Sequence, residues 1–527
     1  MEVLTGQQMR NVDRRTIDEM GIAGLLLMES AGQGVATALV EDYADDLARG
    51  LLIVCGKGNN GGDGFVVGRH LKRMGFSPRI LLLAPAEEIR GDAEVNLRAA
   101  RASGVEIQEV TDRDAWSAAR SAIGESSLVL DAILGTGIKG GARGLAARVI
   151  QDLNSFGTCV VALDIPSGLD ADSTDVPGVA VGAEHTYTLC RPKLPLVLGA
   201  AATHAGSWSV IPIGIPDEAV RREQAEIEWL DAEAVRELLP ERDPETHKGT
   251  FGHLMAIAGS RGKSGAAVLV GLAALRSGVG LMTVAVPRGS LESVAAGRAE
   301  IMTEPLGETS AGTLARGAAS RALRLLADRD VLAIGPGLGT SPETRQVVVS
   351  LLARRTCPAV ADADALNALA EETKVSPATL AARRFPLVIT PHPGEAARLL
   401  KTTTAKIQSD RIGAVRRLTR RTGAIVVLKG HRTLVGAPDG RIAVNSSGNP
   451  GMATAGTGDV LTGMIGAFLA RGLETWDAVR LAVFVHGAAG DRAASALGHD
   501  GLIAGDLISK IPDTMNALQR GDSLPLW

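Results

Sequence analysis

The sequence predicts two α/β domains, each built on a parallel sheet with helices on both faces. Short apolar segments of strand length alternate with helical patterns through both halves of the chain, and this alternation is typical of such sheets. Polar, glycine-rich loops follow several of these strands, at the edge where parallel sheets bind ligands. Hydrophobic residues make up 45% of the 527 positions, so a large core is expected and wholesale disorder is excluded.

In the first half, two helical patterns precede a series of strands and loops. The helical patterns cover Gly6–Met20 and Leu25–Val40, and a third runs to Met74. Short apolar runs bounded by turn residues indicate strands. Strands are predicted at Leu51–Cys55, Arg79–Ala84, Leu128–Asp131 and Cys159–Leu163.

The pattern changes around Pro212–Glu228, where prolines and charged residues mix and no strand is indicated. We therefore expect one domain over residues 1–222 and a second over 223–527, without a repeat that relates them. The stretch from Thr457 onward is mostly helical. Strands of the second domain are predicted at Leu254–Ala258, Leu281–Ala285, Val331–Ile334, Ala359–Ala361, Leu387–Ile389 and Ile425–Leu428.

Composition argues against several classes of protein. The 55 basic and 59 acidic residues give a net charge of −4, whereas nucleic-acid-binding proteins carry a basic surplus. Aromatic residues make up only 3%, which weakens the case for base stacking. No apolar run approaches a membrane span, and no signal peptide is visible. The four cysteines form no C-x-x-C pair, which predicts reduced structural thiols. We expect a cytoplasmic protein that binds neither nucleic acid nor membranes.

The loop GKGNNGGDG, Gly56–Gly64, follows a strand and opens a helix. Free backbone N–H groups of Gly61, Gly62 and Asp63 at the helix start would attract an anion. A tight turn in which Asp63 caps the helix is an alternative that this loop alone leaves open.

Two later loops favour a ligand-binding site over a merely structural turn. They are DAILGTGIKGGARG, from Asp131, and DIPSGLDAD, from Asp164. Three strands thus deliver Asn60, Asp131 and Asp164 to one edge of the sheet. With Ser167 they supply hard oxygen ligands, which suit an alkali or alkaline-earth cation. Asp164, at a strand end, is also placed to move protons.

The segments LLLMESAG, GKGNNGGDG, DAILGTGIKG and DIPSGLDAD, in this order, resemble the NAD(P)H-hydrate epimerase family over nearly all of residues 1–220. The resemblance implies a Rossmann-like three-layer fold, a catalytic Asp164, and K⁺ bound by Asn60, Asp131 and Ser167. Ser30 departs from the family's LMENAG segment, which has Asn there. By the same resemblance, the hydrated nicotinamide nucleotide is bound by Asn59, Asn60, Gly61, Gly62, Asp63, Gly135, Thr136, Gly137, Ile138, Lys139, Gly140, Gly141 and Asp164.

The second half carries a phosphate-binding pattern in NPGMATAGTGDVLTG, Asn449–Gly463. Gly456 and Gly458 precede a helical pattern that starts near Asp459, and the free N–H groups of a helix start favour phosphate. Asp459 could remove a proton from a substrate hydroxyl, although a glycine-lined helix contact with Asp459 as cap is the alternative. GKS at Gly262–Ser264 is not a Walker motif, because position 257 is Ile257.

These motifs, with GPGLG, TPHPGE and KGHRT, resemble the ADP-dependent NAD(P)H-hydrate dehydratases, a branch of the ribokinase-like kinases, over about residues 225–520. The resemblance implies ADP or ATP as co-substrate, Mg²⁺ at its phosphates, and a catalytic Asp459. It implies that the hydrated nucleotide is bound by Ala266, Gly337, His392 and Asp459. It implies that ADP or ATP is bound by Lys429, Gly430, His431, Arg432, Thr433 and Gly458.

Together the resemblances imply a repair enzyme for NADH and NADPH that have added water at C6 of the nicotinamide ring. The first domain would interconvert the R and S epimers, and the second would dehydrate the S epimer at the expense of ADP or ATP. A ribokinase-like small-molecule kinase with a regulatory or scaffold first domain is the alternative. The intact loops around Asp131, Asp164 and Ser167 disfavour it. We also expect a homo-oligomer. The sequence leaves open the preference for ADP or ATP, the preference for NADH or NADPH hydrate, and any catalytic role of Lys139.

Overall fold

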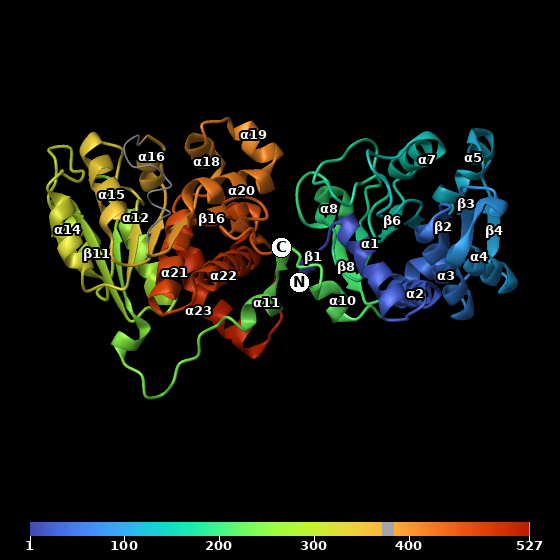
Figure 1. The fold of residues 1–527 in the computed structure, drawn as a ribbon, viewed down its shortest axis with the longest axis horizontal. Helices are drawn as coiled ribbons and strands as arrows, with labels where there is room; N and C mark the ends of the chain where they lie inside the picture. Colours follow the sequence, from blue (N-terminus) through green and yellow to red (C-terminus); the bar gives the residue numbers. More distant parts are fainter. Residues whose placement is uncertain (372–383, 526–527) are drawn as a thin grey trace. The chain divides into compact units, whose positions relative to one another are not determined.

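The computed structural model describes residues 1–371 and 384–525, and the chain divides into two compact units (Figure 1). The N-terminal unit contains Glu2–Ile227, and the C-terminal unit contains Glu228–Trp527 together with Met1. The division falls a few residues beyond position 222. Glu223 belongs to the first unit because its carboxylate pairs with Arg15 at 2.9 Å and accepts a hydrogen bond from Asn11 at 3.1 Å.

The N-terminal unit is built on a seven-stranded sheet in which all neighbouring strands are parallel. The four strands predicted from apolar runs are present as β2, β3, β5 and β6. The other three were missed because polar residues interrupt them. In spatial order the strands are β4 (Glu106–Glu109), β3 (Arg79–Leu82), β2 (Leu51–Cys55), β5 (Leu128–Ala132), β6 (Cys159–Leu163), β7 (His185–Leu189) and β8 (Ser207–Ile211).

Helices cover both faces of this sheet, which gives three layers. Ile53 of β2 packs into the core on one face with residues of α1 to α4, and Leu52 and Val54 pack on the other face with α5 to α7. The short strand β1 (Glu2–Val3) precedes α1. The helices are α1 (Gly6–Arg14), η1 (Arg15–Glu19), α2 (Gly24–Arg49), α3 (Asn59–Arg73), η2 (Ala86–Glu88), α4 (Gly91–Ala102), α5 (Arg113–Ala119), α6 (Ser121–Gly124), α7 (Gly144–Ser155), α8 (Leu194–Val197), α9 (Ala202–Ala205) and α10 (Asp217–Arg221).

The C-terminal unit has a mixed sheet. Its strands are parallel from β12 to β16, and β17 and β18 add antiparallel to that edge. All six predicted strands are present. In spatial order the strands of this unit are β9 (Ile227–Leu230), β18 (Ile442–Asn445), β17 (Leu434–Gly436), β16 (Ile425–Leu428), β15 (Leu387–Ile389), β14 (Ala359–Ala361), β13 (Val331–Ile334), β10 (His253–Ile257), β11 (Leu281–Pro287) and β12 (Met302–Leu306).

Helices again lie on both faces of this sheet (Figure 1). On one face, α12, α21, α22 and α23 bury side chains against alternate strand residues such as Ala256 and Val284. The helices are α11 (Ala232–Arg236), η3 (Lys248–Phe251), α12 (Ser264–Arg276), η4 (Arg288–Ser290), α13 (Leu291–Ala295), α14 (Ala318–Leu326), α15 (Pro342–Arg354), α16 (Asp364–Glu371), α18 (Pro393–Leu400), α19 (Thr404–Ser409), α20 (Arg411–Thr422), η5 (Pro450–Met452), α21 (Thr457–Ala470), α22 (Thr475–Leu497) and α23 (Ala504–Arg520).

The prediction of two α/β halves with largely parallel sheets is confirmed. The four cysteines are free thiols, as expected. Within residues 1–371 and 384–525, no helix has the length and apolar character needed to cross a bilayer.

The structure predicts that damage to one core leaves the other unit intact. Trp116 of α5 is 1% exposed, and its indole N–H donates to Asp152 at 2.8 Å. Trp116→Ala is expected to destabilise the N-terminal unit by about 3–5 kcal/mol. Hydrogen exchange measured peptide by peptide should then rise within residues 2–227 only. An equal rise in the peptides of the C-terminal unit would contradict the division into two units.

Candidate active sites

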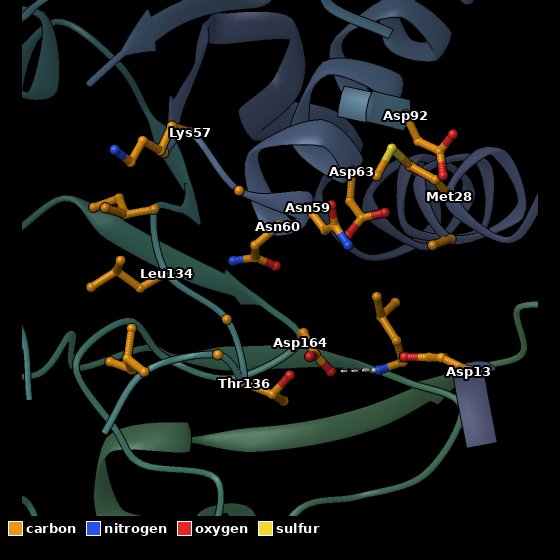
Figure 2. A pocket seen from close by; sticks show the side chains of 18 of the residues that line it. Asp13, Met28, Lys57, Asn59, Asn60, Asp63, Asp92, Leu134, Thr136 and Asp164 are labelled. Atoms are coloured by element: carbon orange, nitrogen blue, oxygen red, sulfur yellow. Dashed lines mark hydrogen bonds between the residues drawn. The ribbon is translucent and has the colours of Figure 1, made fainter. Parts of the chain in front are cut away.

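A cavity of about 820 Å³ opens at the carboxyl edge of the N-terminal sheet. The loops after β2, β5 and β6 line it together with α1 and the start of α2 (Figure 2). Among the described residues, Gly61, Gly62, Lys139, Gly140 and Gly141 are not part of this lining. The predicted nucleotide-binding residues that do line it are Asn59, Asn60, Asp63, Gly135, Thr136, Gly137, Ile138 and Asp164.

Helix α3 begins earlier than the glycine pattern suggested. Gly58 is its N-cap, and the N–H group of Gly62 already donates to the Gly58 carbonyl at 3.1 Å. The free N–H groups of the first turn are therefore those of Asn59, Asn60 and Gly61, so that Gly61 can contribute as predicted but Gly62 and Asp63 cannot. Asp63 lies inside the helix and lines the cavity, so it is not a cap. Gly61 has a packing role, because a Cβ there would lie 1.9 Å from the Gly56 carbonyl oxygen.

Asp164, directly after β6, forms an ion pair with Lys193 inside this cavity (Figure 2). Lys193 is fully buried. The Oδ1 atom of Asp164 also accepts the backbone N–H of Leu189 at 3.1 Å. Asp164 has a φ of 69°, a left-handed conformation that Asp tolerates better than most residues. The carboxylate is thus fixed by its backbone and by its partner.

Two further carboxyl groups share the cavity. Burial raises the pKa of Asp13 to about 6, where Lys193 acts in the opposite direction and Asp164 adds to the rise. Burial also raises the pKa of Asp63 well above its usual range, and the charges of Asp164 and Asp13 add to this effect. Three carboxyls around one ammonium cannot all ionise easily, so the cavity can hold protons near neutral pH.

Of the predicted cation ligands, Asn60 lines the cavity, whereas Asp131 and Ser167 do not. Asp131 is fully buried, and its Oδ1 atom accepts the Ser167 hydroxyl at 2.6 Å while its Oδ2 atom accepts the Ser167 N–H at 2.8 Å. Burial raises the pKa of Asp131 to about 6. The Asn60 side chain packs near Gly135, and its buried Nδ2 atom has no hydrogen-bond partner within residues 1–371 and 384–525. Asp131 and Ser167 are thus in direct contact, and the side-chain amide of Asn60 can still donate a hydrogen bond.

The second site forms where α21 begins. Lys429, directly after β16, lies 2.8 Å from Asp362, which follows β14. The Thr462 hydroxyl of α21 donates to the other oxygen of Asp362 at 2.9 Å. A Cβ on Gly458 would lie only 3.2 Å from the Lys429 Nζ atom. Glycine therefore lets the positive end of the helix lie beside an ammonium, which makes this corner suited to phosphate.

Asp459 lies in the first turn of α21, which starts at Thr457 after Gly456. Burial raises the pKa of Asp459 to about 7, and Asp362 and Asp364 add to the rise while Lys429 opposes it. A carboxyl group with this pKa can accept a proton near neutral pH.

The other residues predicted for this half have varied surroundings. A Cβ on Gly337 would lie 3.0 Å from that of Ala266, so the two backbones approach closely. His392 accepts the Gly394 N–H at 3.0 Å and caps α18. Arg432 stacks over Trp229 at 4.6 Å. Thr433 donates to the Gly430 carbonyl at 3.0 Å, and the His431 carbonyl accepts from Arg411. The side chains of Arg432 and Thr433 thus contact other parts of the protein. The backbone of Lys429–Thr433 is therefore the part of this segment that could contact a ligand.

Two family models match the chain, one in each half. The model described as YjeF-related protein N-terminus matches residues 24–194, and the model described as NAD(P)H-hydrate dehydratase matches residues 254–513. The bifunctional NAD(P)H-hydrate repair enzyme Nnr of Moorella thermoacetica is 45% identical over 521 residues, 99% of this chain and 98% of that protein. The chain belongs to the family of bifunctional NAD(P)H-hydrate repair enzymes.

A second full-length relative agrees with this family. The bifunctional NAD(P)H-hydrate repair enzyme Nnr of Escherichia coli is 36% identical over 508 residues, 96% of this chain and 92% of that protein. A solved ADP/ATP-dependent NAD(P)H-hydrate dehydratase from Bacillus subtilis, co-crystallised with ATP and Mg²⁺, is 31% identical. It covers 55% of this chain and 98% of its own, with a TM-score of 0.48. Membership of the repair-enzyme family is supported over the alternative of a small-molecule kinase with a scaffold domain.

The sequence analysis did not identify three charged residues that the structure places in the two sites. Lys193 stands in RPKLP directly after β7, where a lysine between prolines at the ligand edge of the sheet was a usable signal. Asp362 opens the DADALN segment directly after β14, where an acidic residue at the ligand edge of the sheet was a usable signal. No sequence pattern around Asp13 points to the site, because only folding brings α1 to the cavity.

The Asp164–Lys193 pair predicts a specific stability pattern. Lys193→Met keeps most of the apolar stem but leaves a carboxylate without its cation in a buried site, and should cost about 3–5 kcal/mol. The double variant with Asp164→Asn should recover a large part of that loss. Urea unfolding of the full-length chain, with hydrogen exchange to assign the transition of the N-terminal unit, measures both. Additive losses in the double variant would contradict the pairing.

The raised pKa of Asp459 predicts a pH-dependent stability. Between its ordinary pKa of 3.8 and about 7, the folded chain keeps a proton that the unfolded chain has released. The free energy of unfolding therefore falls as pH rises through this range. Asp459→Asn removes this fall, so the variant should be more stable than the parent at pH 8 and nearly equal at pH 4.5. Urea unfolding at both pH values without nucleotide checks this; an equal difference at both would contradict it.

Proposed function

We propose that the N-terminal unit interconverts the R and S hydrates of NADH and NADPH, and that the C-terminal unit dehydrates the S hydrate with ADP or ATP. The observation that carries this proposal is that each unit has its own buried lysine–carboxylate pair at the carboxyl edge of its sheet, with a proton-carrying carboxyl beside it. The near full-length similarity to enzymes named for this repair supports it.

In the N-terminal unit, the cavity of about 820 Å³ is large enough for a substantial part of a dinucleotide. The start of α3 and the Gly135–Ile138 segment would bind its polar groups. Asp164 would act as acid or base at the hydrated carbon, because it faces the cavity and is held rigidly by Lys193. Gly61, Gly62, Lys139, Gly140 and Gly141 would act through the shape of the loops.

The residues proposed for potassium fit a cation. Asp131 is a fully buried carboxylate, and within the described parts of the chain no lysine, arginine or histidine pairs with it. A cation beside it would favour its charged form. The oxygens of Asn60, Asp131 and Ser167 are hard ligands of the type that an alkali cation takes. Bound there, K⁺ would supply positive charge that orders the loops after β2, β5 and β6.

In the C-terminal unit, Asp459 would remove the proton from the C6 hydroxyl as the phosphoryl group arrives. Phosphate is a far better leaving group than hydroxide, and its departure from C6, together with loss of a proton from C5, restores the ring double bond. The N–H groups at the start of α21 and the ammonium of Lys429 would stabilise the charge that develops on the phosphoryl group. Ala266, Gly337 and His392 would contact the hydrated nucleotide, and Lys429–Thr433 with Gly458 would contact ADP or ATP.

Magnesium would be bound mainly by the nucleotide phosphates and water, as this ion usually is. A cytoplasmic location and a homo-oligomeric state stay predictions from the sequence.

Two single variants should separate the activities. Asp164→Asn keeps the shape of the side chain and suits the left-handed backbone, but it removes a proton carrier, so epimerisation should fall by about 10²–10⁴. Asp459→Asn should abolish ADP-dependent dehydration of the S hydrate. Each variant should keep the other activity. Chromatography of purified epimers, with and without ADP, measures both reactions.

The matched controls are Asp18→Asn and Asp328→Asn, which change exposed carboxylates in the two units. Both should behave as the parent chain does. Full epimerisation by Asp164→Asn, or full dehydration by Asp459→Asn, would refute the corresponding assignment. Absence of both activities from the parent chain would refute the proposed function as a whole.

A further inference from the structure

The cavity of the N-terminal unit contains a charged cluster that a single acid–base residue does not explain. Its members are Lys193 and the carboxyl groups of Asp13, Asp63 and Asp164, all of which line the cavity. They come from different segments: α1, α3, the end of β6 and the loop before α8. A parallel bridge between Leu4 and Lys193 ties the segment before α1 to that loop.

Lys193 has no proton to spare for a ligand. An ammonium has three N–H donors, and three acceptors surround this one. They are Asp164 Oδ1, the Leu189 carbonyl at 2.8 Å and the Thr188 hydroxyl at 3.3 Å. Lys193 therefore acts as a fixed positive charge and not as the proton donor of the site.

One carboxylate oxygen of Asp164 accepts hydrogen bonds from the protein, and the other is available to a ligand. Its Oδ1 atom accepts from Lys193, from the Leu189 N–H at 3.1 Å and from the Thr188 hydroxyl at 3.4 Å. Its Oδ2 atom is left for a ligand, because no hydrogen bond to it occurs within the described residues. An ion-paired carboxylate with one open oxygen is a base that can accept the proton of a substrate hydroxyl.

Epimerisation of a ring hydrate needs a proton donor as well as a base. As the base removes the hydroxyl proton, the O–H electron pair forms a C6=O bond and the C6–N1 bond breaks. Its electron pair passes to N1, which must take up a proton. After rotation, N1 attacks the other face of C6, N1 returns its proton, and the new alkoxide is reprotonated. Two residues that exchange roles complete this cycle with no net gain or loss of protons.

We propose that Asp13 is this second residue: it protonates the ring nitrogen as the ring opens and takes the proton back as the ring closes. The proposal rests on the proposed epimerase function. Asp13 lines the same cavity as Asp164 (Figure 2), and the charges of Lys193 and Asp164 act on its carboxyl group. Within residues 1–371 and 384–525, its carboxyl group makes no hydrogen bond or ion pair, and its side chain is only partly buried. It is therefore free to meet a ligand.

Asp63 is the alternative to Asp13 as the second proton carrier, and the two residues differ in burial. Asp63 is only 7% exposed and sits within α3, beside Asn59 in the cavity wall (Figure 2). The charges of Asp164 and Lys193 act on both residues, but Asp13 is only partly buried, so a ligand in the cavity meets its carboxyl group more readily.

The charged and titratable groups that face Asp13 set the pH range of the test. They are Lys193, Asp164, Asp63 and the Cys190 thiol. Burial raises the pKa of Asp13 to about 6. Asp13 donates only in its protonated form, and that form is lost as pH rises. Epimerisation by the parent chain should therefore decline on the alkaline side of a pH profile.

The experiment measures epimerisation by the full-length chain from pH 5 to 9, starting from each purified epimer of NADH hydrate, with the uncatalysed rate subtracted. Asp13→Asn should lower kcat by about 10²–10⁴ and should lose the alkaline decline. Asp13→Glu should restore part of the rate together with the decline. Asp18→Asn, an exposed change nearby, should match the parent. ADP-dependent dehydration of the S hydrate should be unchanged in all three variants, and Asp13→Asn should unfold at no lower temperature than the parent, since the protein no longer carries a carboxyl group whose pKa burial raises.

Three results would overturn the inference. The first is a parent-like rate and profile for Asp13→Asn. The second is a uniform loss at all pH values that Asp13→Glu does not reverse, which would mean a structural role. The third is loss of the alkaline decline in Asp63→Asn but not in Asp13→Asn. If the parent chain dehydrates the S hydrate but epimerises neither form, the proposed epimerase function itself fails, and this result is distinct from the other three.

Discussion

A lysine paired with a buried carboxylate at the end of a parallel strand is the interaction on which both candidate sites depend. In the N-terminal unit the pair is Lys193 and Asp164, and in the C-terminal unit it is Lys429 and Asp362. A charge in a site shielded from water is costly unless an opposite charge accompanies it. Each pair therefore lets its unit place ionised groups where a ligand can meet them, and the other polar groups are arranged around it.

Both sites contain more carboxyl groups than ammonium groups, and this excess has a chemical result. Asp13 and Asp63 share the field of Lys193, as Asp459 and Glu395 share that of Lys429. The surplus carboxyls cannot all lose their protons at neutral pH, so some keep pKa values near 6 or 7. Those values are what reversible proton transfer requires near pH 7. One pattern thus serves two reactions on two unrelated sheets.

Local sequence predicted much of this arrangement because strands and their following loops are local features. The apolar runs located the central strands, and the loops after them located Asp131, Asp164 and Asp459. Strand β4, with the sequence EIQE, has no apolar run to reveal it. The missed charges depend on distant pairings: Lys193 meets Asp164 across 29 positions, and Thr462 meets Asp362 across 100. Such contacts follow from the order of strands in the sheet, which no local pattern encodes.

The backbone of Asp164 has a consequence for how a ligand would be recognised. A residue other than glycine at a φ of 69° stores about 1–3 kcal/mol of strain, which the surrounding fold must hold. The Asp164 N–H donates to the Tyr187 carbonyl at 2.8 Å, so the neighbouring strand β7 fixes this turn. Folding of the sheet, and not ligand binding, therefore supplies the free energy that aims the carboxylate. A substrate meets a preorganised oxygen and loses little binding free energy in ordering it, and only the few residue types that tolerate left-handed backbone could occupy this position without reshaping the loop.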